Sequence, residues 1–203
     1  MMKTYLVATT KSWNADAFAE HTPSLPGHWH LITDPAELSL ERVRELNPRY
    51  IFFPHWSWRV PKAILEAAEC VCFHMTDVPY GRGGTPLQNL IVRDHTETVL
   101  TALQMVKEMD AGPVYWKRPL ALHGSAAEIY ERGAHLAYEM MEHLVTHEPT
   151  PDPQTGEVTL FSRRGPQDSE LPEDGDAQAI YDHIRMLDAD TYPRAFLKRG
   201  GLR

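Results

Sequence analysis

The chain has 203 residues, 42% of them hydrophobic, and it carries a formal net charge of −8 at pH 7. A sequence of this length and apolar content can build the core of one ordinary domain, which excludes a disordered protein. Two cysteines exclude a disulfide framework. The acidic balance argues against a nucleic-acid partner, which would need clustered basic side chains.

The amino-terminal segment has too short an apolar run for a signal peptide, and no run of about 18 apolar residues is present to cross a membrane. The low cysteine content fits a reducing compartment. We therefore expect a cytoplasmic protein without membrane contact.

The first half of the chain alternates between predicted strands and predicted helices. Short apolar runs indicate strands at residues 5–8, 29–32, 50–53 and 70–73. Asp34 is the expected N-cap of a helix with Pro35 at its first position. Residues 61–68 predict a second short helix. This alternation favours a parallel sheet with right-handed crossover connections.

The second half is predicted to carry longer helices. Val99, Leu103 and Val106 recur at helical spacing and predict a helix. Residues 114–116 predict a strand, and a capping box at residues 125–128 opens a long amphipathic helix.

Three segments follow from this pattern. Residues 1–147 are predicted to form the core, residues 148–176 a proline-rich linker or loop with a short strand, and residues 177–203 a final helix and tail. The fold class is α/β, a Rossmann-like, doubly wound and mostly parallel sheet with a small C-terminal extension. Exposed apolar positions around the last helix are compatible with either a monomer or a homodimer.

A histidine and a distant carboxylate are the strongest candidates for catalysis. His74 follows the strand at residues 70–73 and enters a turn rich in proline and glycine. Asp110 interrupts a later apolar run and is followed by Ala-Gly-Pro-Val. Ligands of open α/β sheets bind beyond strand ends, and histidine with a carboxylate is a common acid–base pair. We therefore predict that His74 and Asp110 act together.

These residues carry a family resemblance. His74, Thr76 and Pro79 form a His-x-Thr-x-x-Pro frame, and Asp110 opens an Asp-x-Gly motif. The arrangement resembles the folate-dependent formyltransferases, whose hallmark is Asn-x-His-x-Ser/Thr-x-x-Pro followed by Asp-x-Gly. The family's asparagine falls on Cys72.

A second segment narrows the resemblance to one branch. Residues 184–196 are similar to the Arg-x-Leu…Pro…Ala-Phe segment of methionyl-tRNA and sugar N-formyltransferases. The resemblance spans residues 48–146 and 177–196, whereas the first 45 residues match in pattern only.

The resemblance implies transfer of a formyl group from N10-formyltetrahydrofolate to an amine through a tetrahedral intermediate. His74 would polarise the formyl oxygen and move a proton, and Asp110 would hold the imidazole's protonation state. Cys72 is a weak hydrogen-bond donor where the family has a strong one. Another donor could replace it, the activity could be slow, or the site could bind folate without turnover.

The resemblance also implies two groups of binding residues. Those expected to hold the folate are Phe53, His55, Trp56, Trp58, Thr76, Asp77 and Gly112. Those expected to face the amine substrate are Tyr80, Gly81, Arg82, Gly83, Gln88 and Asn89, of which Arg82, Gln88 and Asn89 are also candidates to replace the missing asparagine. Trp56 and Trp58 could instead simply cover the helix that follows them.

The acidic charge favours a small amine as the acceptor, and we expect an amino sugar carried on a nucleotide. The chain also stops where the tRNA enzyme would begin a separate domain that holds the nucleic acid. A folate-binding protein without transfer activity and a formyltetrahydrofolate hydrolase are the alternatives.

A zinc site is a competing interpretation of the same strand. Cys70, Cys72 and His74 point to one face of a strand, and their side chains are ligands that zinc accepts. Side chains two residues apart on one straight strand do not easily point at a single ion. We therefore expect no metal.

Overall fold

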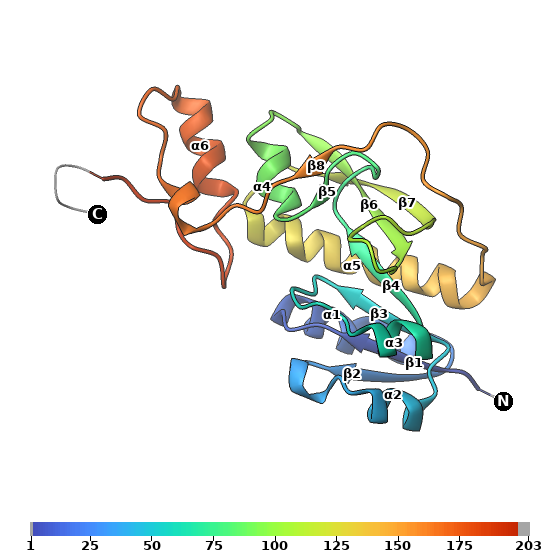
Figure 1. The fold of residues 1–203 in the computed structure, drawn as a ribbon. Helices are drawn as coiled ribbons and strands as arrows, with labels where there is room; N and C mark the ends of the chain where they lie inside the picture. Colours follow the sequence, from blue (N-terminus) through green and yellow to red (C-terminus); the bar gives the residue numbers. More distant parts are fainter. Residues whose placement is uncertain (1, 199–203) are drawn as a thin grey trace.

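The computed structural model describes residues 2–198. Its centre is a six-stranded sheet with the order β2-β1-β3-β4-β6-β7 (Figure 1). The strands are β1 (Thr4–Ala8), β2 (His28–Ile32), β3 (Tyr50–Pro54), β4 (Glu69–His74), β6 (Glu97–Gln104) and β7 (Val114–Ala121). Strands β1 to β4 pair in parallel, whereas β6 is antiparallel to both of its neighbours. A second sheet pairs β5 (Arg82–Gly83) with β8 (Leu160–Phe161).

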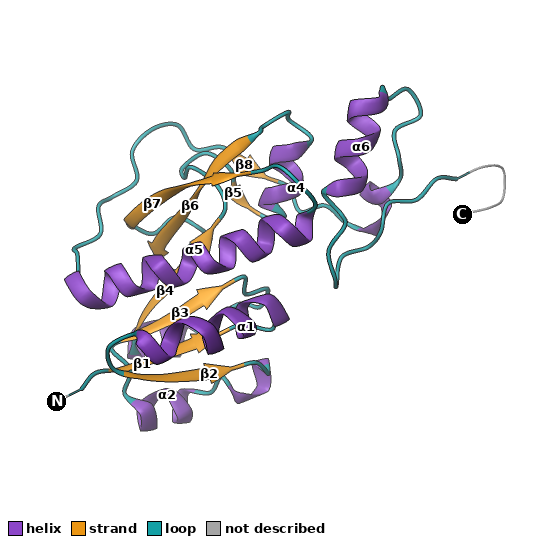
Figure 2. Cartoon of the chain, turned by 180° about the vertical axis from the view of Figure 1, so that it is seen from behind, coloured by secondary structure: helices purple, strands orange, loops and turns teal. Residues whose placement is uncertain are grey.

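Helices cover both faces of the large sheet (Figures 1 and 2). They are α1 (Ser12–His21), α2 (Leu40–Leu46), α3 (Lys62–Ala67), α4 (Pro86–Ile91), α5 (Ala126–His147) and α6 (Ala177–Arg185). Three short 3-10 turns complete the elements, at Thr22–Ser24, Pro35–Glu37 and Pro166–Ser169. In Figure 2 the long helix α5 crosses the sheet beside α1, while α6 lies at the far end near α4.

Two apolar clusters form the core, one on each face of the sheet. Alternate residues of a strand point to opposite faces, so Val7 and Phe52 pack with α1 and α5. Leu6 and Ile51 pack with α2 and α3 on the other face. This two-sided burial explains why the parallel strands read as continuous apolar runs.

Local sequence signals set the ends of the principal helix. The hydroxyl of Ser125 accepts from the backbone N–H of Glu128, and the Glu128 carboxylate accepts from the backbone N–H of Ser125. This reciprocal capping box satisfies two orphan donors of α5. The helix ends where Glu148 adopts a left-handed backbone with φ of 45°.

The fold class is confirmed, together with the strands of the first half and the helices α2, α3 and α5. The predicted helix through Val99 and Leu103 is wrong, because residues 97–104 form strand β6. The helical spacing arises because both faces of this strand are buried. Leu100 packs on the side of α5, Leu103 is fully buried, and a bulge between Ala102 and Leu103 shifts the alternation.

Sequence reasoning found neither α1 nor α4. The proposed N-cap at Asp34 is present, but it caps a single 3-10 turn, and Ser39 caps α2 separately. In residues 2–198 no helix combines the length and apolar character that a membrane span needs.

Candidate functional site

His74 lies at the carboxyl end of β4 and is 8% exposed. Its ring is fixed because Nε2–H donates to the carbonyl oxygen of Gly81 at 2.8 Å. A carbonyl can only accept, so this bond assigns the proton to Nε2 and leaves the Nδ1 lone pair free. Nδ1 faces Oδ2 of Asp110 at 3.6 Å, which is longer than a direct hydrogen bond.

Asp110 is held by backbone groups. Its Oδ2 accepts from the N–H of Gly83 at 2.9 Å, and its own backbone has a φ of 52°, in the left-handed region. The side-chain amide of Gln154 donates to the carbonyl oxygens of Asp110 at 2.8 Å and Gly112 at 2.7 Å. The Gln154 oxygen in turn accepts two bonds from Arg82. Gln154 therefore clamps the Asp110 loop to the Arg82–Gly83 turn, and sequence reasoning missed it because no motif precedes it in the loop.

Asp110 reaches His74 by a route that the sequence did not indicate. His74 ends a parallel strand, as expected, but Asp110 follows β6, which runs antiparallel to β4. The loop between β6 and β7 starts beside Cys70, where the N–H of Met105 donates to the Cys70 carbonyl. This loop, and not a shared edge of parallel strands, brings the carboxylate to the imidazole.

The pair lies in the wall of a cavity of about 740 Å³, a size typical of small-molecule sites. The predicted residues that line it are Phe53, His55, Trp56, Trp58, Cys72, His74, Gly83 and Asp110. One further feature points to a ligand that carries hydrogen-bond acceptors. The buried indole N–H groups of Trp56 and Trp13, both lining residues, have no partner within the described structure. A buried donor without a partner costs free energy, so a ligand that accepts from it would bind more tightly.

Basic side chains also line the cavity: Lys11, Arg59, Lys62, Lys107 and Arg163. Their arrangement is compatible with a carboxylate or phosphate on the ligand despite the acidic charge of the whole chain.

Several predicted binding residues do not line this cavity. Thr76 is buried and donates to the Gly81 carbonyl, Asp77 pairs with Lys117 at 2.6 Å, and the Tyr80 hydroxyl contacts His95. Each of these side chains supports the turn between β4 and α4.

Glycines of the predicted site act through close backbone approach. A Cβ on Gly112 would lie 1.7 Å from the Gln104 carbonyl oxygen, so no side chain fits there. Gly83 pairs with Phe161 in the small sheet, and Gly81 packs against the Phe161 ring. The pairing of β5 with β8 holds this turn in place.

The three candidates to replace the missing asparagine are engaged elsewhere. Gln88 donates to the Tyr130 hydroxyl and the Met186 carbonyl, and Asn89 donates to the Gly84, Thr85 and Ser162 carbonyls. Both amides are buried because α4 packs its residues into the core. Arg82 is bound to Gln154. The structure therefore brings none of the three to the cavity.

Cys72 lines the cavity as a neutral thiol. Burial raises its pKa far above the ordinary range, and the Asp110 carboxylate adds to this effect. Burial likewise raises the pKa of Cys70 to about 12. Within residues 2–198, the ligand atoms of Cys70, Cys72 and His74 do not form a metal-sized group.

An aromatic cluster that sequence reasoning missed closes one side of the cavity. Trp13 stacks on Tyr130 with ring centres 5.5 Å apart, and Tyr130 stacks on Tyr192 at 5.4 Å. The His55 Nε2 lies 2.8 Å from the Tyr192 hydroxyl, and Lys11 lies over the Trp13 ring. These residues come from α1, α5 and two loops, so no local pattern could have grouped them.

His55 should make stability depend on pH. Burial, and secondarily the nearby Lys11, lowers the pKa of His55 from 6.5 to about 3. Below about pH 6.5, His55 of the unfolded chain binds a proton, whereas His55 of the folded protein stays neutral down to about pH 3. The stabilisation by neutral His55 is therefore lost as the pH falls from about 6.5 to about 3. We expect the free energy of unfolding, measured by urea titration from pH 7.5 to 4.5, to fall less steeply in His55→Asn. Asparagine also tolerates the positive φ of 54°.

The matched control is His28→Gln, an exposed histidine on β2. If the free energy of unfolding fell equally steeply with pH in His55→Asn and in wild type, this would contradict the lowered pKa of His55.

Comparison with known proteins places this site in a family. The family described as "Methionyl-tRNA formyltransferase, C-terminal domain" matches residues 166–203. The solved methionyl-tRNA formyltransferase from Clostridium thermocellum is 46% identical, with a TM-score of 0.94, over 98% of this chain and 89% of that one.

Two further relatives are more distant. The methionyl-tRNA formyltransferase of Enterococcus faecalis is 29% identical over 83% of this chain and 58% of its own length. HypX from Aquifex aeolicus, solved in complex with tetrahydrofolic acid, shares the fold with a TM-score of 0.78 at 18% identity, over 97% of this chain and 36% of that one. The chain spans about half the length of the curated relatives it matches. By its similarity to the Clostridium protein over nearly the whole of both chains, this protein belongs to the formyltransferase family that includes the methionyl-tRNA formyltransferases.

Proposed function

We propose that this protein transfers a formyl group from N10-formyltetrahydrofolate to an amine. The observation that carries the proposal is the His74–Asp110 pair in the wall of a cavity of about 740 Å³. Family membership supports the reaction type.

The cavity fits a folate. Its unpartnered indole donors on Trp56 and Trp13 can donate to the nitrogen and oxygen acceptors of a pterin ring. Phe53 and Trp56 pack edge to face with ring centres 5.7 Å apart and offer an apolar wall for a flat heterocycle. The basic lining residues are suited to the carboxylates of the glutamate tail.

When bound, the donor supplies a formyl group whose carbon forms a bond to the acceptor nitrogen and loses its bond to the folate nitrogen. A proton must leave the attacking amine and arrive on the released folate nitrogen. Nδ1 of His74 is the free ring nitrogen and can accept that proton, since Nε2–H is committed to Gly81. The negative charge of Asp110, whose Oδ2 lies 3.6 Å from Nδ1, then stabilises the imidazolium.

For the acceptor, we propose the amino group of an aminoacyl-tRNA, because the relative at 46% identity is a methionyl-tRNA formyltransferase. The match of residues 166–203 to a C-terminal domain of methionyl-tRNA formyltransferase also favours this acceptor. The second candidate is an amino sugar carried on a nucleotide, favoured by the net charge of −8.

Tetrahydrofolate release separates these candidates. We would incubate the protein with N10-formyltetrahydrofolate alone, with methionyl-tRNA, and with nucleotide-linked amino sugars. Release only with the tRNA or only with a sugar assigns the acceptor, and release without any amine identifies a hydrolase. No release, with folate still bound, would favour a binding protein and contradict the proposed transfer.

Folate binding is tested with 5-formyltetrahydrofolate, a stable analogue of the donor. Calorimetry should give micromolar binding to wild type and at least about 10-fold weaker binding to Trp56→Ala, because both an aromatic wall and a buried donor are lost. The control is Trp29→Phe, since Trp29 packs on Tyr5 and Phe52 away from the cavity. Equal affinities for wild type and Trp56→Ala would remove Trp56 from the pocket.

Cys72→Asn tests the missing oxyanion donor. The amide would add a strong donor to the cavity wall beside His74, and one such donor is typically worth about 100- to 1,000-fold in turnover. We therefore expect kcat to rise by about 100-fold. Cys72→Ala, which removes the thiol without adding a donor, should leave kcat near the wild-type value, and a rise in both variants would refute the explanation.

A further inference from the structure

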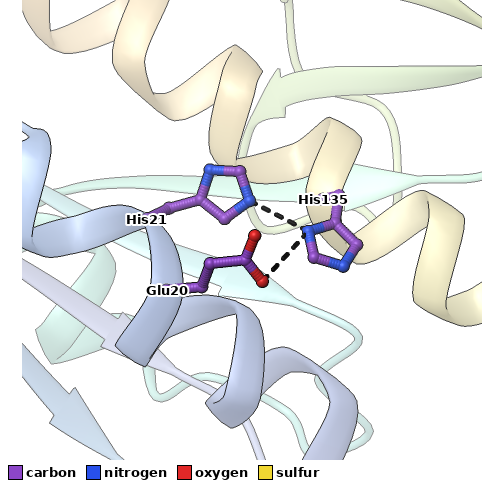
Figure 3. Close-up of side chains that lie close together, drawn as sticks. All are labelled: Glu20, His21 and His135. Carbon is purple, nitrogen blue, oxygen red and sulfur yellow. Dashed lines mark hydrogen bonds and ion pairs between the residues drawn. The ribbon is translucent and has the colours of Figure 1, made fainter.

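Glu20, His21 and His135 form a group of potential metal ligands on the outer side of the α1–α5 contact (Figure 3). Nε2 of His21 lies 2.9 Å from Nδ1 of His135, and Oε2 of Glu20 lies 4.0 Å from the same Nδ1. The ligand atoms of all three lie within 4.8 Å of one another. In Figure 3 the side chains from the end of α1 and from the middle of α5 converge on one point.

We propose that these three side chains bind Zn²⁺. The ion bonds histidine nitrogen and carboxylate oxygen at about 2.0–2.2 Å, so two ligands of a tetrahedral ion lie roughly 3.3 Å apart. The two imidazole nitrogens now share a hydrogen bond at 2.9 Å, and they need to give up its proton and move only slightly apart to reach that separation. Glu20 needs only a side-chain rotation to complete the set, and it is 68% exposed and free to make one.

Packing already orients the ligands. The His21 ring stacks on Tyr138 with centres 5.5 Å apart and an interplanar angle of 15°. Tyr138 is itself fully buried, and its hydroxyl donates to the Asn14 carbonyl. His21 is therefore held by a rigid platform, and a preoriented ligand loses less entropy when it binds a metal.

The electrostatic surroundings favour a cation. His21 is the last residue of α1, where the helix dipole gives a partial negative charge. Among residues 2–198, no lysine or arginine forms an ion pair with Glu20. Three protein ligands leave a fourth position for water, and the bound ion would link α1 to α5.

This site lies outside the formyl-transfer cavity and does not depend on the proposed function. It also departs from our expectation that the chain holds no metal. Because the ion would be held between two core helices, its expected effect is on stability.

Zinc binding to the metal-stripped full chain tests the proposal directly. Calorimetry at pH 7.5 should give one Zn²⁺ per chain in wild type, and Co²⁺ should give the visible absorption of a tetrahedral site. His21→Gln and His135→Gln should each weaken binding by more than the roughly 10- to 100-fold that loss of an outer hydrogen-bond partner costs. Zinc should also raise the Tm of wild type but not of these variants.

The control uses a second histidine pair, both members of which lie on α5. His143 and His147 stack with ring centres 4.3 Å apart and could hold zinc by themselves. His143→Gln/His147→Gln should bind zinc as wild type does. Loss of binding in this control with retention in His21→Gln would move the site there and overturn the proposal, as would the absence of one-to-one binding in the wild-type protein.

Discussion

Replacing His74 with glutamine is expected to lower kcat for formyl transfer by about 100- to 10,000-fold, the usual range for a general acid–base group. Glutamine can still donate to the Gly81 carbonyl, which accepts from Nε2 at 2.8 Å, so the turn should stay in place. What is lost is Nδ1, the ring nitrogen that faces Asp110. Initial rates of tetrahydrofolate release at saturating acceptor measure this effect.

The control is His123→Gln, an exposed histidine between β7 and α5. It should leave kcat unchanged. Folate affinity should also change little in His74→Gln, because the imidazole acts in the reaction and its removal leaves the aromatic walls intact. Unchanged kcat in His74→Gln would refute the proposed role.

The second large effect is expected for Asp110→Asn, which should lower kcat by about 100-fold or more. The asparagine oxygen can still accept from the Gly83 N–H, and the Gln154 bonds to the loop carbonyls do not involve the side chain. The change therefore removes the negative charge beside the His74 imidazole with little change of shape. Asp16→Asn, an exposed carboxylate on α1, is the matched control and should have no effect.

A double variant sharpens this test. If Asp110 acts through His74, then His74→Gln/Asp110→Asn should be hardly slower than His74→Gln alone, because residues that act as a unit are not additive. If kcat of the double variant instead fell by the product of the two single losses, the two residues would act in independent steps.

The sequence was informative where a signal is local. The apolar runs of β1, β3 and β4 and the capping box of α5 are each carried by a few neighbouring residues, and the structure confirms them. The family resemblance likewise rests on short motifs around His74 and Asp110.

Sequence reasoning failed where tertiary contacts decide. Strand β6 was read as a helix because burial on both faces and a bulge at Ala102/Leu103 erase the two-residue period. Gln88 and Asn89 were expected at the substrate, but α4 packs them into the core, where their amides bond to Tyr130 and to backbone carbonyls. The aromatic cluster around Tyr130 joins α1, α5 and two loops, and only folding brings these together.

The sequence by itself determined the fold class and the parallel pairing of the first strands, and it predicted His74 and Asp110 as the catalytic candidates. The tertiary structure alone decided that β6 turns antiparallel and that its following loop brings Asp110 to within 3.6 Å of His74. It also decided that Gln154 holds that loop and that Glu20 and His21 face His135. The physical reason is range: caps and periodic burial act over a few residues, whereas a site is made by side chains that are distant in the chain and meet only when the core has packed.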